Sequence, residues 1–238
     1  FLIAVVAGIL VSIFSLARLL EWLMSDHPVL IWSFFFGLII ASAIVVLRKI
    51  KKWNLIRITG LLTGTILMFF VTQISPAQTT DAYWYIFLAG AVTICAMVLP
   101  GISGAFILLI LGKYQFMLGA VSNLDMPVLL VFATGAVSGL LSFANLLSWF
   151  FSKYHDLTIA VLAGFIIGSL NKIWPWKETV LTSVDSHGEM IPLVQRNILP
   201  GSYFEITGSN PEIVPSVLLM LAAFSLVILL ERLNRKRP

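Results

Sequence analysis

Six apolar segments constrain this chain more than any other feature of its sequence. A membrane-spanning helix needs about 20 predominantly apolar residues. Only 11% of the residues are charged, whereas a soluble domain carries about 25%. The candidate spans are residues 1–24, 29–47, 55–75, 127–151, 157–173 and 213–231. The sequence therefore predicts an all-α integral membrane protein and argues against nucleic-acid binding. The single cysteine, Cys95, lies in an apolar run and is interpreted as a packing residue.

A further apolar stretch, residues 83–120, is broken by Pro100 and Gly101 and decides the topology. A single kinked crossing would place the basic clusters on opposite sides of the membrane, which the positive-inside rule opposes. A hairpin that enters and leaves on one side places ten of the fifteen basic residues in the cytoplasm: Arg48, Lys49, Lys51, Lys52, Arg57, Lys153, Arg232, Arg235, Lys236 and Arg237. The second arm, residues 102–112, would rise about 16 Å, roughly half of the hydrocarbon thickness. We therefore expect a re-entrant broken-helix hairpin.

These segments are interpreted as one membrane domain with its C-terminus in the cytoplasm. It contains first-repeat helices with a connecting helix, the hairpin, second-repeat helices, a periplasmic loop, and a last helix with a basic tail: 1–75, 83–120, 127–173, 174–212 and 213–238. The loop is rich in Trp, Pro and Gly, which is typical of a surface segment with a short hairpin. We expect it to act as a lid or a partner contact.

An internal repeat relates two parts of this plan. Residues 1–42 match the chain 127 positions later without a gap, and thirteen positions are identical, including Trp22 with Trp149 and Gly37 with Gly164. On the topology above, the two copies cross the membrane in opposite directions, as in the inverted repeats of many transporters. The counterpart of the hairpin would lie about 27 residues before Phe1. We therefore expect an N-terminal truncation that removes the first hairpin.

The broken stretch itself, Leu-Pro-Gly-Ile-Ser-Gly-Ala at residues 99–105, indicates a polar site. Backbone groups left unpaired inside a membrane cost several kcal/mol unless they face protein or a polar cavity. A helix that begins here would present free N–H groups, with Gly101 and Gly104 allowing close approach and Ser103 adding a hydroxyl donor. This pattern predicts an anion site. The alternative is a Pro-Gly kink with small residues for helix packing.

Further candidates for binding an anion lie outside the broken stretch. Arg18 is the most deeply placed cation, although it could instead snorkel and pair with Glu21. Ser142 and Asn145 belong to a polar stripe at helical spacing, and the repeat pairs Asn145 with Arg18. Lys113 ends the short hairpin arm, where it could steer an anion or anchor the arm at the interface.

Several of these segments together resemble the bacterial polyprenyl-phosphate transporter family. The resemblance rests on residues 96–104, the Leu-Gly-Lys-Tyr that ends at Tyr114, the Gly and Ser residues of 164–169, and Trp-Pro-Trp-Lys at 174–177. It implies a multi-pass protein of the bacterial inner membrane with two re-entrant hairpins, which returns undecaprenyl phosphate to the inner leaflet for reuse in cell-envelope synthesis. The substrate-binding motif of the family matches Pro100, Gly101, Ser103 and Gly104, while Ala105 stands where Gly is common.

Other functions are weighed against this one. A transporter or channel for a small anion would also suit inverted repeats with broken helices. An intramembrane serine protease is a remote alternative, because none of His27, His155 and His187 is expected within a span near Ser103. We therefore expect no enzyme activity, no catalytic residues, no metal and no cofactor. The expected partner is a membrane lipid rather than nucleic acid, and self-association is left open.

Overall fold

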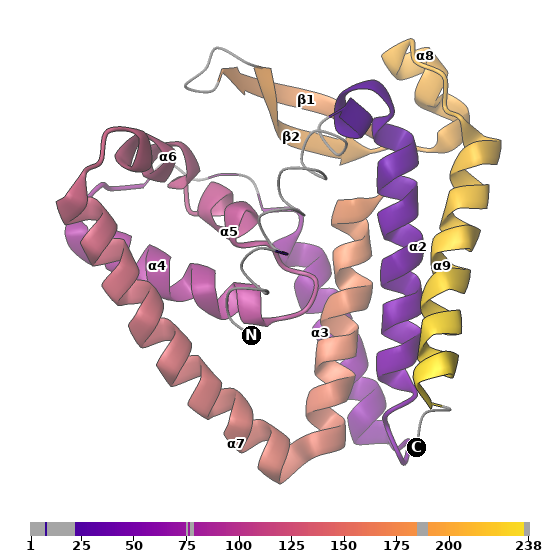
Figure 1. Cartoon of the computed structure of the whole chain (residues 1–238), viewed down its shortest axis with the longest axis horizontal. Coiled ribbons are helices and arrows are strands. Elements are labelled where there is room, and N and C mark those ends of the chain that lie inside the picture. The colour runs from indigo at the N-terminus through magenta and orange to yellow at the C-terminus, as the bar shows by residue number, and fades with distance from the viewer. Residues whose placement is uncertain (1–7, 9–21, 75, 77–78, 185–189, 236–238) are drawn as a thin grey trace. The chain divides into compact units, whose positions relative to one another are not determined.

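The computed structural model describes Gly8 and residues 22–74, 76, 79–184 and 190–235, so nearly all of the predicted span 1–24 lies outside the described residues. Figure 1 shows helices and one two-stranded sheet. The elements are α2 (Pro28–Leu47), α3 (Leu55–Val71), α4 (Tyr83–Val98), α5 (Gly104–Ile110), α6 (Tyr114–Ser122), α7 (Met126–Ile173), β1 (Lys177–Val184), β2 (Met190–Asn197), η1 (Pro200–Ser202), α8 (Tyr203–Thr207) and α9 (Ile213–Arg235). They divide into two compact units.

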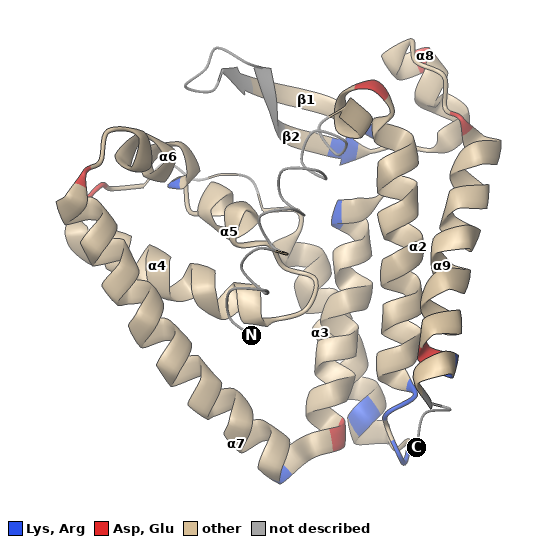
Figure 2. Ribbon diagram, in the orientation of Figure 1, with Lys and Arg blue, Asp and Glu red and all other residues tan. Residues whose placement is uncertain are grey.

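Three helices in the described part of the chain are long and apolar enough to cross a membrane: Pro28–Leu47, Met126–Ile173 and Ile213–Asn234. The bent pair α5 and α6 would make a fourth span if it counted as one. Helix α3 is shorter than the predicted span 55–75, because it ends at Val71 with Thr72 as its C-cap. Figure 2 shows that Lys, Arg, Asp and Glu concentrate at helix ends and in loops, as expected for helices that face lipid.

The first unit comprises residues 1–41, 173–178 and 197–238. Within it, Gly37 of α2 lies directly against the backbone carbonyl of Met220 in α9, so no side chain could fit between the two helices there. Its small core contains the buried Trp176, onto which Trp174 packs. The Trp176 indole N–H donates to the Pro211 carbonyl over 2.8 Å, which fixes the segment before β1 to the segment before α9.

The second unit comprises residues 42–172 and 179–196 and contains the broken stretch. Its main element is α7, which bends at Tyr154, where φ is −133° and ψ is 46°. The bend separates a first arm, residues 126–153, from a second arm, residues 155–172, and the arms form a V in Figure 1. The Thr158 hydroxyl donates to the carbonyls of Phe150 (3.2 Å) and Tyr154 (2.9 Å). It thereby satisfies carbonyls beside the bend, where regular helical bonding is interrupted.

Helix α3 packs on the second arm of α7 through glycines. A Cβ at Gly64 would lie 2.5 Å from the Val161 carbonyl oxygen, and one at Gly164 would collide with the Leu61 carbonyl oxygen. Because lipid chains are as apolar as a helix surface, such close backbone contact is a main source of helix association in a membrane. At the bend, Arg57 forms an ion pair with Asp156 at 3.3 Å, which joins the start of α3 to α7.

Helix α4 packs on the first arm in the same way. A side chain at Gly135 would meet the Phe87 carbonyl, and a side chain at Gly90 would meet the Phe132 carbonyl. Helix α4 then ends at Val98, the chain turns, and α5 returns along α4 (Figure 1). This helical hairpin is consistent with the predicted one, but α5 has only seven residues instead of the predicted arm 102–112. Ser103 caps its N-terminus and Leu111 its C-terminus, so it rises only about 10 Å.

Two features of the described residues bear on the predicted repeat. The offset of 127 residues pairs Tyr154 with His27, which is non-helical and separates the helical turn 22–26 from α2. The same offset pairs Gly164 with Gly37. Gly164 packs on α3, whereas Gly37 packs on α9. Each glycine therefore contacts the helix that follows the other copy.

Candidate functional site

The broken stretch forms a turn that only glycine can make at its centre. Leu99 is extended after α4, and Gly101 follows with φ at +89°, a backbone conformation that L side chains rarely adopt. A Cβ at Gly101 would lie 2.6 Å from the Ser169 hydroxyl oxygen on the second arm of α7. The turn, which we call the hairpin tip (residues 99–104), therefore lies directly against that arm. Pro100 is half-buried in the tip.

Ser103 is exposed and lies in the tip as the N-cap of α5. Its hydroxyl oxygen accepts a hydrogen bond from the Phe106 N–H over 3.3 Å. A serine hydroxyl has one hydrogen to donate besides its acceptor lone pairs. The capping bond uses only a lone pair, so the Ser103 hydrogen remains available to an anion.

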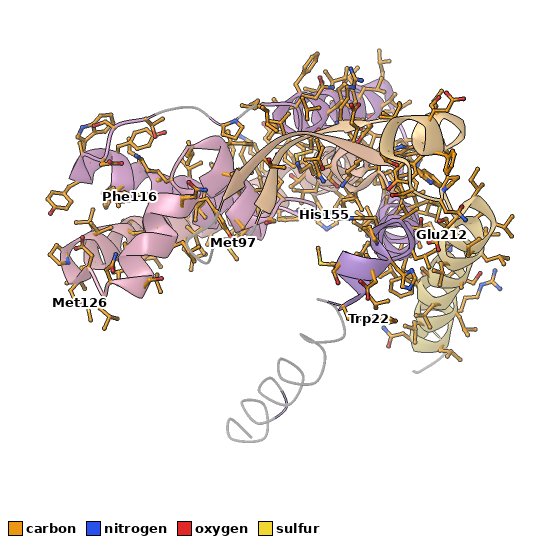
Figure 3. All side chains as sticks on the ribbon, turned by 90° about the horizontal axis from the view of Figure 1, so that it is seen from above. Trp22, Met97, Phe116, Met126, His155 and Glu212 are labelled. Carbon is orange, nitrogen blue, oxygen red and sulfur yellow. The ribbon has the colours of Figure 1, made fainter. Side chains whose placement is uncertain are left out.

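Gly104 has a different environment from Gly101. It is buried against α4, where a Cβ would lie 2.6 Å from the Met97 sulfur and 3.1 Å from the Thr93 methyl group. Met97 is labelled in Figure 3, in the part of the molecule that also holds Phe116 and Met126. The small size of Gly104 thus serves helix packing as well as any approach of a ligand. The neighbouring Thr93 hydroxyl is buried and has no hydrogen-bond partner among the described residues.

Lys172, which the sequence analysis did not single out, lies beside the start of α5. Its Nζ lies 4.9 Å from the centre of the Phe106 ring, three residues after Ser103. None of the acidic residues that the structure describes pairs with it. In the sequence it occurs at the end of a predicted span, where a lysine is typical of snorkelling to the interface. Lys172 differs from an ordinary snorkelling lysine because the hairpin tip packs on the helical arm that carries it.

Lys113 is buried at the far end of the hairpin and already has partners. Its Nζ pairs with Asp81 at 2.5 Å and donates to the Thr79 carbonyl over 3.1 Å. The rings of Tyr85 and Phe116 lie 5.5 and 5.3 Å from the same nitrogen. These contacts account for the placement of Lys113 without an anion.

The remaining candidates are not brought to the tip by any contact within the described part of the chain. Ser142 and Asn145 are exposed on the first arm of α7. Arg18 lies outside the described residues. His155, one of the three histidines considered for a protease, contacts Asp156 at the bend instead of Ser103. The described residues also contain no cluster of three His, Cys, Asp or Glu side chains that could hold a metal.

Long apolar helices, glycine-mediated helix packing and a broken hairpin define this chain as a multi-pass helical membrane protein. A family model described as undecaprenyl phosphate translocase-like matches residues 1–191. The chain belongs to that family, which makes it a transporter rather than an enzyme.

Two curated relatives carry the name polyprenyl-phosphate transporter. The protein of Vibrio cholerae is 45% identical over 236 residues, which cover 99% of this chain and 77% of the relative. The protein of Staphylococcus aureus is 29% identical over 194 residues, which cover 74% of this chain and 68% of the relative. No solved structure matches this chain.

Proposed function

We propose that this protein carries a polyprenyl phosphate across the membrane and that the hairpin tip binds the phosphate. The observation that carries the proposal is the placement of Lys172 over the ring of Phe106, whose backbone N–H is capped by the exposed hydroxyl of Ser103. The printed names of the two relatives support the class of lipid. The lipid is undecaprenyl phosphate, returned from the outer to the inner leaflet of the bacterial inner membrane for reuse in cell-envelope synthesis.

The physical requirement is to replace the water around a charged phosphate. Transferring an ion out of water without new hydrogen bonds is prohibitive. The tip offers the Ser103 hydroxyl and the N–H groups of Gly104 and Ala105, which have no acceptor within the helix that they begin. Lys172 offers an ammonium group whose contact with the face of the Phe106 ring consumes none of its hydrogens.

The same proposal includes the architecture of inverted repeats and a hairpin that re-enters the membrane. It is supported by the corresponding breaks at His27 and Tyr154 and by the exchanged partners of Gly37 and Gly164. An inverted pair of half-sites could alternate between the two leaflets. Arg18 is assigned to the phosphate when it reaches the first half, and Ser142 and Asn145, which are exposed on the first arm of α7, line its route to the tip.

A binding measurement tests the assignment of the tip. Purified protein is titrated with radiolabelled undecaprenyl phosphate, with undecaprenol and inorganic phosphate as competitors. Ser103→Ala should weaken binding roughly tenfold or more, because a hydrogen bond to a charged group contributes about 1.5 to 3 kcal/mol. Lys172→Gln should weaken it by a similar factor. Lys153→Gln is the matched control, because Lys153 also lies over aromatic rings but at the bend of α7.

Undecaprenol should not compete, since it lacks the phosphate. Effective competition by undecaprenol, or normal affinity in both Ser103→Ala and Lys172→Gln, would return the tip to a packing kink. Displacement by inorganic phosphate as effective as by the lipid itself would instead favour a transporter for a small anion.

A further inference from the structure

An apolar cavity of about 300 Å³ lies inside the V of α7, next to the hairpin tip. The first arm contributes Phe143, Leu147 and Phe150 to its wall, and the second arm contributes Leu162 and Phe165. Leu99, the first residue of the tip, completes the wall. The Thr158 hydroxyl also borders it but is used by two backbone carbonyls, so the wall presents no polar atom to the cavity.

The cavity is large enough to require an explanation. A volume of about 300 Å³ is at the lower end of the range of small-molecule sites. Phe150 and Tyr154 are 40% and 43% exposed, so the wall is not sealed on every side. An apolar chain can therefore enter it, whereas water would find no polar partner inside.

We propose that the isoprene units next to the phosphate occupy this cavity when the tip binds a polyprenyl phosphate. The inference rests on the proposed function and adds a site for the chain of the lipid. Leu99 is both part of the cavity wall and the residue before Pro100, so a phosphate bound at the tip places its first isoprene units beside the cavity. The volume holds a short segment of the lipid, and the rest of the chain stays in the bilayer.

The expected gain is specificity rather than strong binding. Lipid chains are as apolar as the cavity wall, so transfer from the bilayer brings little hydrophobic free energy. What the cavity adds is van der Waals contact with a branched chain, including contacts with the rings of Phe143, Phe150 and Phe165. A saturated acyl chain is narrower and would fill the same space less well. The cavity therefore favours an isoprenoid over an ordinary phospholipid chain.

Photo-crosslinking tests this assignment on the whole protein in membranes. Two analogues of undecaprenyl phosphate carry a diazirine, one on the first isoprene unit and one on the last, and a phosphatidylglycerol carries one on an acyl chain. The first analogue should label residues 143–165, and unlabelled undecaprenyl phosphate should compete. Leu147→Trp should lower this labelling roughly tenfold, because a larger side chain fills the space. Leu141→Trp is the control on the same arm, since Leu141 is 62% exposed and outside the cavity wall.

The outcomes separate this inference from the proposed function. The site for the lipid chain would be overturned if Leu147→Trp left the labelling unchanged, or if the phosphatidylglycerol labelled the protein equally well. In either case, specific binding of undecaprenyl phosphate would still support the proposed function. Failure of the wild-type protein to bind undecaprenyl phosphate would overturn both. Leu162→Phe, a smaller change in the same wall, replaces Leu147→Trp if gel filtration shows that the latter does not fold.

Discussion

The glycines of the hairpin tip have different physical roles, although the sequence motif treats them alike. Gly101 is needed for its backbone conformation and for its closeness to Ser169, whereas Gly104 faces the flexible end of Met97. The sequence could indicate that residues 99–105 break a helix, because Pro and Gly interrupt an apolar run. It could not show Lys172, since that residue is 69 positions beyond Ser103 and approaches the tip only through the packing of α7.

Gly101→Ala is therefore expected to be more damaging than Gly104→Ala. A positive φ costs an L residue about 1 to 2 kcal/mol, and the added methyl group would also displace Ser169. At Gly104 the added methyl group would meet the flexible side chain of Met97, which can change rotamer to make room. Thermal unfolding in detergent should show a larger fall in Tm for Gly101→Ala. Equal Tm values for the two variants would contradict the assigned roles.

The ion pair between the buried Lys113 and Asp81, whose side chain is 64% exposed, gives a second prediction at this scale. Asp81→Asn leaves a lysine that is 2% exposed without its counter-ion. Leaving a buried charge uncompensated is more costly than replacing both partners. The single variant should lose about 1 to 3 kcal/mol of stability, and adding Lys113→Met should recover part of the loss in a double-mutant cycle. Additive losses would show that the pair does not stabilise the hairpin.

At the scale of elements, hydrophobic length predicted where helices occur but not how they bend or end. The predicted spans 127–151 and 157–173 correspond to the two helical arms of α7, which are separated by the non-helical Tyr154. The second arm of the hairpin is shorter than expected, because Ser103 caps α5 after a turn that uses residues 99–103. Caps and bends depend on single hydrogen bonds, which hydropathy does not register.

A glycine-to-alanine substitution should have different effects at a close helix contact and at an open helical position. Gly64 of α3 lies against α7, whereas Gly119 of α6 has open space beside it. Gly64→Ala should destabilise the protein by about 1 to 3 kcal/mol, because its Cβ would meet the Val161 carbonyl. Gly119→Ala, in α6, should be neutral or stabilise it by up to about 1 kcal/mol, because that position is open and Ala favours helix. Thermal unfolding of both variants measures the difference. A stable Gly64→Ala variant would show that α3 and α7 do not pack this closely.

At the scale of the whole molecule, the sequence predicted a helical membrane protein correctly, because apolar length alone requires it. It also indicated the family, whose motifs are local. The inverted repeat stays a prediction, since most of its first copy lies outside the described residues. The cavity beside Leu99 could not be foreseen, because it depends on the angle between two arms of one helix.

The proposed topology makes a prediction that requires no knowledge of the substrate. Cysteines introduced at Ser186 and Asn234, in a Cys95→Ser background, should react differently with an impermeant thiol reagent in intact cells. Only the cysteine at position 186 should be labelled, because the positive-inside rule predicts that the basic C-terminal end lies in the cytoplasm. Labelling of only position 234 would contradict the hairpin topology.

Leaflet exchange in proteoliposomes tests the central claim most directly. The protein is reconstituted with labelled undecaprenyl phosphate or labelled undecaprenol, and exchange is followed for the wild type, Ser103→Ala, Lys172→Gln and the control Lys153→Gln. We predict protein-dependent exchange of the phosphate lipid only, impaired in Ser103→Ala and Lys172→Gln and normal in Lys153→Gln. Equal exchange of undecaprenol, or normal exchange in both tip variants, would contradict the assignment of the hairpin tip as the phosphate site.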